Sequence, residues 1–148
     1  MANVGGMSIP QERMATILGL DRKAGSKRRL AEIIRSGLPA TSFDSVSRYT
    51  NLGRKRLAAV VSISQRTLDR RLQRRERFQP DESDRLARIA RVYALAEEVF
   101  GSREAAEEWM ADANRSLDGA RPVDLLDTEM TARDVEDLIG GIPAGVFF

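Results

Sequence analysis

The densest group of side chains suited to binding a polyanion lies in residues 54–77, with nine Lys or Arg residues and two acidic ones. Arginine and glutamine can form paired hydrogen bonds with base edges in the DNA major groove, and basic side chains neutralise phosphates. The residues expected to contact DNA are Arg54, Lys55, Arg56, Gln65, Arg66, Arg70, Gln73 and Arg74. An ordinary solvated surface is the alternative, and the density of basic charge favours a nucleic-acid interface.

A helix-turn-helix over residues 54–72 would position these side chains. The apolar residues that would pack its two helices together are Leu57, Val61, Ile63 and Leu68. Ser64 is suited to cap the second helix. Two positions depart from the usual pattern, because Ser62 replaces the turn glycine and Arg71 stands where an apolar residue is usual. We expect Leu72 to supply that apolar contact, and Arg71 to favour DNA binding along with Arg66 and Arg70.

A second basic cluster precedes this region and consists of Arg22, Lys23, Lys27, Arg28 and Arg29. It either adds phosphate contacts or forms the solvated start of a helix, and the sequence favours neither interpretation. A lone helix-turn-helix buries little surface on DNA, so specific binding is expected to need a dimer on paired half-sites.

The charges of the chain are separated into two halves. Residues 1–77 carry 17 basic and 6 acidic side chains, whereas residues 78–148 carry 7 basic and 16 acidic ones. The net charge of +2 therefore hides a balance of +11 in the first half and −9 in the second. The basic half attracts nucleic acid, while the acidic half repels phosphate and is more suited to a protein partner.

Composition argues against several kinds of site. The chain contains no Cys and no His, which excludes zinc fingers, disulfides, Cys nucleophiles and His general bases. Carboxylates could in principle form an acid/base pair or hold Mg²⁺. However, the groups at 81–84 and 104–108 are spaced as helix-start and helix-surface residues. We therefore expect no enzymatic activity, cofactor or metal. We also expect a cytoplasmic protein without a membrane partner, since no apolar run or leader segment is evident.

The hydrophobic periodicity predicts an all-α fold of roughly seven short helices, with no convincing strand. Helices are expected to begin near Pro10, Ser26, Ser42, Arg54, Ser64, Pro80, Ser102 and either Thr128 or Thr131. The helix from Pro80 to Gly101 carries apolar residues on two faces and should be central to the core. We predict a mobile arm and short helix at 1–25, a DNA-binding region at 26–79 and a small helical domain at 80–148.

The last residues, 140–148, begin with two glycines and end with two phenylalanines and the terminal carboxylate. The rings could fill a pocket on a partner, with the carboxylate meeting a basic residue there. Alternatively, Val146 and Phe147 could fold back onto their own domain. Arg121 is similarly ambiguous, since it could pair with a carboxylate of its own domain or contact a partner. The acidic residues suited to a cationic partner surface are Asp127, Glu129, Asp134, Glu136 and Asp137.

Three motifs in the C-terminal third carry a family resemblance. They are Arg121-Pro122-Val123-Asp124-Leu125-Leu126-Asp127-Thr128, Val135-Glu136-Asp137-Leu138-Ile139 and the ending Gly145-Val146-Phe147-Phe148. Over residues 27–148 the chain resembles the antitoxins of Xre–RES toxin–antitoxin pairs, the ParS/MbcA group. The helix-turn-helix alone would not be specific to that group.

The resemblance implies a non-catalytic antitoxin that forms homodimers and larger hetero-oligomers with its toxin. Such antitoxins cover the active site of a RES-domain toxin, which degrades NAD or transfers ADP-ribose from it, and the complex binds its own double-stranded promoter DNA. The residues expected to contact the toxin are Arg121, Glu136, Ile142, Gly145, Val146, Phe147 and Phe148. The alternative is a stand-alone helix-turn-helix transcription regulator with a ligand-sensing or dimerising C-terminal domain.

Overall fold

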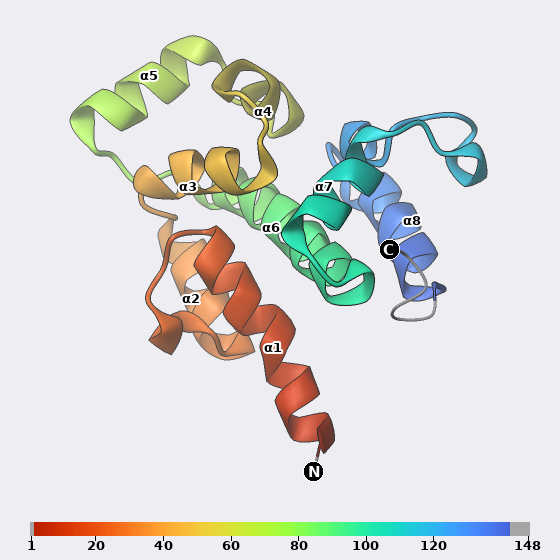
Figure 1. The fold of residues 1–148 in the computed structure, drawn as a ribbon. Coiled ribbons are helices and arrows are strands. Elements are labelled where there is room, and N and C mark those ends of the chain that lie inside the picture. Colours follow the sequence, from red (N-terminus) through yellow and green to blue (C-terminus); the bar gives the residue numbers. More distant parts are fainter. Residues whose placement is uncertain (1, 143–148) are drawn as a thin grey trace.

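The computed structural model describes residues 2–142, with side chains described from Pro10 onward. All the regular secondary structure of these residues is helical, with no strand among them, which confirms the predicted all-α class (Figure 1). The α-helices are α1 (Ala2–Ile17), α2 (Lys27–Ser36), α3 (Thr41–Thr50), α4 (Arg54–Val60), α5 (Gln65–Arg74), α6 (Pro80–Phe100), α7 (Arg103–Ala111) and α8 (Glu129–Gly140). Three short 3₁₀-helices join them, namely η1 (Arg22–Ala24), η2 (Arg115–Leu117) and η3 (Pro122–Leu125).

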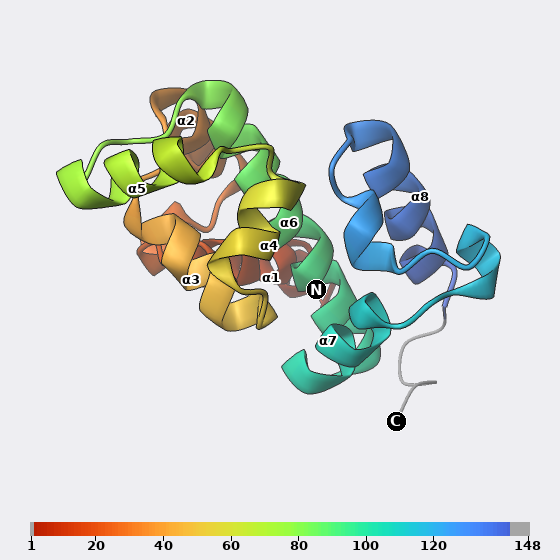
Figure 2. The same cartoon turned by 90° about the horizontal axis from the view of Figure 1, so that it is seen from above.

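Helix α6 is the central element, as the two-faced apolar pattern predicts. It packs against α1, α2 and α3 from the N-terminal half and against α7 and α8 from the C-terminal part (Figures 1 and 2). Pro80 occupies the first turn, where a missing N–H costs nothing. Gly101 ends the helix in the left-handed conformation, with φ of 92°. Both groups of helices therefore share one core along α6.

Polar side chains cap the N-termini of four helices, as the sequence predicts. Ser26, Ser64 and Ser102 each accept a hydrogen bond from the backbone N–H three residues ahead. Thr128, rather than Thr131, does the same for α8. Such a cap satisfies one otherwise unpaired N–H and typically contributes about 1 kcal/mol.

Helix α1 differs from the expectation, because the stretch predicted as an arm is helical from Ala2 and the helix runs through Pro10. A proline inside a helix removes one backbone hydrogen bond, and Gly5-Gly6 disfavours a helix. For these reasons the sequence predicts that the first helix begins at Pro10. The C-terminal turns of α1 are held by tertiary packing, with Ala15, Ile17 and Leu18 fully or almost fully buried. The first turns extend away from the body of the molecule (Figure 1).

A close backbone contact fixes the segment that follows α5. Gly37, at the end of α2, has φ of 100°, and a Cβ atom there would overlap the carbonyl oxygen of Phe78. The Phe78 N–H donates to the Leu38 carbonyl at 2.9 Å, and the Leu38 N–H donates to Ser83 Oγ at 2.8 Å. The loops after α2 and α5 are thereby tied to the first turn of α6, which sets the position of α5.

Candidate functional site

Helices α4 and α5 form the predicted helix-turn-helix. The side chains expected between them, Leu57, Val61, Ile63 and Leu68, are all buried. The turn residue Ser62 has φ of 56°, so it adopts the left-handed conformation for which glycine is usual at this position. Ser62 thus takes the backbone conformation of the usual glycine, and the packing between α4 and α5 is preserved.

Arg71 corrects part of the sequence interpretation. Its side chain is buried, with the residue only 7% exposed, and its guanidinium lies 3.1 Å from Glu82 and 3.3 Å from Glu76. Glu82 also accepts the Gln79 N–H at 2.7 Å. Leu72 packs against the core as expected, but it is only half-buried. Arg71 therefore fastens α5 to the start of α6, and it no longer counts in favour of DNA binding.

The other predicted DNA contacts on α5 are exposed. Among the described residues, Gln65, Arg66 and Gln73 have no ion-pair or hydrogen-bond partner for their side chains. Arg70 and Arg74 lie 3.3 and 4.0 Å from Glu76. Exposed pairs of this kind contribute little, so these guanidinium groups can exchange Glu76 for a phosphate at small cost. Helix α5 lies at the edge of the molecule in both views, with its outer face open (Figures 1 and 2).

The three basic residues that begin α4 have different surroundings. Lys55 is exposed, and Arg54 makes a two-point contact with Asp44, at 3.1 and 3.0 Å. Arg56 is half-buried and donates to Asp124 at 3.1 Å, while Arg121 donates to the other oxygen of the same carboxylate at 3.0 Å. Asp124 thus joins one predicted DNA contact, Arg56, to one predicted protein contact, Arg121.

The charge of Asp124 depends on these two neighbours. Partial burial would raise its pKa, but hydrogen bonds from Arg56 and Arg121 outweigh this, so the pKa lies below its ordinary value. A carboxyl whose pKa is depressed by folding stabilises the folded state above its ordinary pKa, 3.8 here, and this contribution disappears as the pH falls through the lower folded-state value.

We expect Asp124→Asn to lower the free energy of unfolding at pH 7 by at most about 1 kcal/mol, because the carboxylate and both guanidinium groups are partly exposed. The difference from the parent protein should be smaller at pH 3, which lies below the ordinary pKa of 3.8, because the unfolded chain is then largely protonated at this carboxyl and the contribution of the charge declines. Urea unfolding at both pH values measures this. An equal difference at pH 7 and pH 3 would show that the charge of Asp124 is not what stabilises the contact.

A second cluster of charges, not predicted from the sequence, holds α8 against α6. Arg88 is buried, and it donates to Glu129 at 3.2 Å and to the carbonyls of Leu126 and Asp127 at 3.3 and 3.2 Å. Arg91 contacts Glu136 at 2.7 and 2.9 Å and also Glu129. The sequence does contain a periodic pattern that could have indicated this cluster. Arg88 and Arg91 are three apart, and Glu129 and Glu136 are seven apart, so each pair lies on one face of its helix.

This cluster occupies Glu136, one of the predicted partner contacts. Burial would raise the pKa of Glu129, but the charges and hydrogen bonds of Arg91 and Arg88 outweigh this effect and lower it. Glu129 is therefore ionised, and both glutamates contact arginines of α6. The exposed carboxylates of this region are instead Asp127, Asp134 and Asp137. Ile142 is half-buried against the core, while Gly145, Val146, Phe147 and Phe148 lie outside the described residues.

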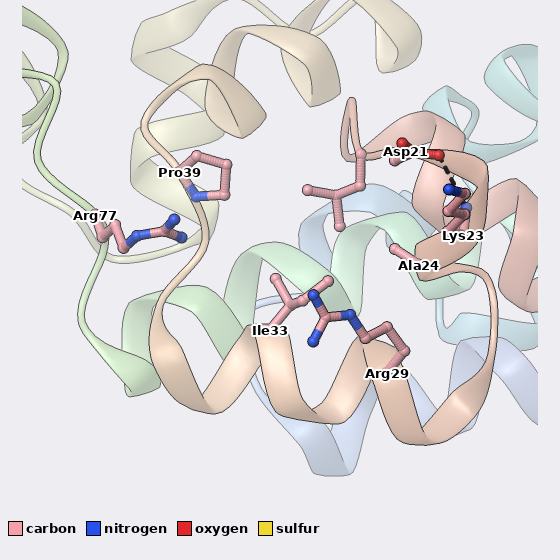
Figure 3. A pocket seen from close by; sticks show the side chains of 8 residues that line it. Asp21, Lys23, Ala24, Arg29, Ile33, Pro39 and Arg77 are labelled. Atoms are coloured by element: carbon pink, nitrogen blue, oxygen red, sulfur yellow. Dashed lines mark hydrogen bonds between the residues drawn. The ribbon is translucent and has the colours of Figure 1, made fainter.

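The second basic cluster is exposed, and two of its residues, Lys23 and Arg29, border a hollow of about 360 Å³. Arg29 approaches this hollow from α2, and Arg77 approaches it from the segment after α5 (Figure 3). Arg77 also donates to the Gly37 carbonyl at 2.9 Å, and Asp21 accepts the Lys23 N–H at 3.0 Å. Leu20, Ile33 and Pro39 also line the hollow. Its polar and apolar side chains are mixed, so they do not indicate a particular ligand.

The part of the chain that the structure describes lacks two other kinds of site. No three acidic side chains there are grouped so that they could hold a metal ion. None of the helices there is both long and apolar enough to cross a membrane.

Comparison with known families gives two matches that together cover most of the chain. Residues 29–91 match the antitoxin Xre-like helix-turn-helix domain, and residues 95–145 match the antitoxin Xre/MbcA/ParS C-terminal toxin-binding domain. The junction between these matches falls inside α6, which packs against both groups of helices.

Three relatives carry the name Antitoxin Xre. The protein of Photorhabdus laumondii is 35% identical over 124 residues, covering 83% of this chain and 84% of the relative. The protein of Yersinia enterocolitica is 34% identical over 131 residues, covering 88% and 87%. The protein of Pseudomonas putida is 36% identical over 83 residues, covering 56% and 52%.

Proposed function

The chain belongs to the antitoxin Xre family, and from this we propose that it neutralises a RES-domain toxin and binds its own promoter. The C-terminal region covers the active site of a toxin that degrades NAD or transfers ADP-ribose from it. The helix-turn-helix binds double-stranded DNA, as a homodimer or as part of a larger complex with the toxin. The antitoxin itself has no catalytic role.

The observation that carries this proposal is the separation of two surfaces of opposite charge. The exposed basic side chains of α5 lie at one end of the molecule, and the exposed carboxylates of α8 lie on the toxin-binding domain at the other (Figures 1 and 2). Since the surfaces do not overlap, one chain can hold DNA and toxin together. The charge cluster between α6 and α8 keeps the toxin-facing helix in a fixed orientation.

The toxin contacts that we propose follow from the sequence motifs and from this geometry. Gly145, Val146, Phe147 and Phe148 enter the toxin, with Ile142 at the base of this tail. Arg121 and Glu136 are held by Asp124 and Arg91 and contribute mainly by fixing the surface around the tail. The acidic residues of α8 complement a cationic rim, as expected around a pocket that binds the phosphates of NAD.

Co-expression with the RES-domain protein of the neighbouring gene tests the proposed function. We expect the two proteins to purify together through size-exclusion chromatography and the cells to keep growing. If the RES protein arrests growth and never purifies with this chain, the antitoxin function is wrong. A transcription regulator that acts alone would then be the remaining interpretation.

If α5 binds the promoter, Arg66→Ala should weaken the binding of promoter DNA. This exposed arginine, in the first turn of α5, has no ion pair among the described residues, so it is free to contact a base edge or phosphate. A two-point contact with a base contributes about 1–3 kcal/mol, so the promoter fragment should bind roughly 10-fold more weakly or worse. Fluorescence anisotropy at fixed salt concentration measures the Kd.

Arg35→Ala is the matched control, because Arg35 is also exposed, lies near the end of α2 and has no ion pair in residues 10–142. It should change the Kd by less than about 2-fold, which is well below the loss expected when one specific base contact is removed. Equal losses in the two variants would indicate attraction by overall charge rather than an interface on α5.

A further inference from the structure

A groove on the toxin-binding domain lies between the η2 turn and helix α8 and has a volume of about 570 Å³. Three half-buried leucines line it, namely Leu117, Leu125 and Leu138. Ser116, Thr131 and three carboxylates also line it, and the carboxylates, those of Asp118, Asp134 and Asp137, form its exposed rim. All three are exposed, and none has an ion pair among the described residues. The groove is therefore apolar within and negative at its rim.

The same side of α8 carries another unusual residue. Met130 is 78% exposed, and it is the one large apolar side chain in the described residues that is mostly exposed. It precedes Asp134 by four residues and Asp137 by seven, so the three lie along one face of the helix. A methionine on the surface beside an apolar groove is typical of a face that another molecule covers.

We propose that this groove docks a basic segment of the toxin, outside the active site that the tail covers. The aliphatic stems of Arg or Lys side chains lie over the leucines, and their charged ends meet the carboxylates at the rim. This inference rests on the proposed function and adds a second, separate point of attachment to it.

The length of the tail places the toxin beside this groove. Residues 143–148 begin three positions after the end of α8 and can span about 22 Å at most, at 3.3–3.6 Å per residue. Leu138 lies one turn before Ile142, so a toxin whose active site receives the tail must lie close to the groove. Residues 143–148 themselves are a poor occupant, because they carry no basic side chain that could meet the carboxylates of the rim.

The test reverses the charge of the rim in Asp134→Lys/Asp137→Lys. Both residues are exposed, and Asp137 lies in the last turn of α8, where a lysine is favourable, so the double variant should fold like the parent protein. We expect its Kd for the purified toxin to rise about 100-fold, mainly through slower association, and the salt dependence of association to fall. Surface plasmon resonance at several salt concentrations measures both.

Glu108→Lys/Asp112→Lys is the control, since it changes the net charge equally, at two exposed positions in and after α7. It should leave the Kd within about 3-fold of the parent value, as expected for charges outside the contact. Leu138→Ser tests the apolar part, and it should weaken binding about 10-fold without altering the salt dependence.

Three results would overturn this inference. The first is an unchanged Kd in the rim variant, and the second is an equal loss in the control. The third is a change in the oligomeric state of the antitoxin alone, which would assign the groove to a second copy of this chain. Failure of the proposed function would look different, because the parent protein would then bind no toxin.

Discussion

Arg88→Ala is expected to lower the free energy of unfolding by about 3 kcal/mol or more, since it removes the buried member of an ion-pair cluster. The variant leaves two carbonyls, those of Leu126 and Asp127, without the donor that satisfies them. It also weakens the attachment of Glu129, and with it the first turn of α8. Urea unfolding followed by circular dichroism measures the loss.

Arg133→Ala provides the comparison, because Arg133 pairs with the same glutamate at 3.2 Å but its side chain is 71% exposed. An exposed pair contributes about 0–1 kcal/mol, so this variant should be close to the parent protein. If the two variants lost the same stability, burial of Arg88 would not be what fastens α8. We also expect Arg88→Ala to weaken toxin binding more than DNA binding, since α8 is far from α5 (Figure 2).

Ending the chain after Gly141 is expected to raise the concentration needed to inhibit the toxin by at least about 100-fold. The deletion removes two phenylalanine rings, and each can bury about 150–250 Å² in a partner. The helix-turn-helix and the α6–α8 charge cluster remain, so promoter binding and thermal stability should change little. Inhibition of NAD consumption by the purified toxin measures the loss.

Phe147→Ala/Phe148→Ala separates the rings from the rest of the tail. If the rings enter the toxin, this variant should lose most of the inhibition that the deletion loses. If the deletion inhibits as well as the full chain, the tail is not the inhibitory element. The surface of α8, including the groove, would then have to account for neutralisation by itself.

The features that depend on local sequence could be predicted. Ser26, Ser64 and Ser102 start their helices as expected, because a side-chain oxygen near the first turn satisfies an N–H within the same segment. The helix-turn-helix follows from the spacing of Leu57 to Leu68, and α6 follows from its sustained apolar faces. The basic residues expected on α5 are likewise exposed, apart from the buried Arg71.

The features that depend on distant residues could not be predicted. The local sequence predicts Arg71 as a surface residue, because its partners Glu76 and Glu82 are identified only in the folded structure. Asp124 meets Arg56 across 68 positions of sequence, and Arg88 meets Glu129 across 41. The groove combines leucines from η2, η3 and α8, and no single periodic pattern relates them. The helices could therefore be predicted from local sequence, whereas the ion pairs that join them could be identified only in the tertiary structure.

The central claim is that the two ends of this chain act separately, one on DNA and the other on a RES-domain toxin. The most direct measurement is NAD consumption by the purified toxin, titrated with the full chain in the presence and absence of the promoter fragment. We predict that consumption falls to background at a fixed molar ratio in both titrations, with the toxin–antitoxin complex remaining on the DNA. Undiminished NAD consumption at excess antitoxin, or its recovery when DNA is added, would contradict the claim.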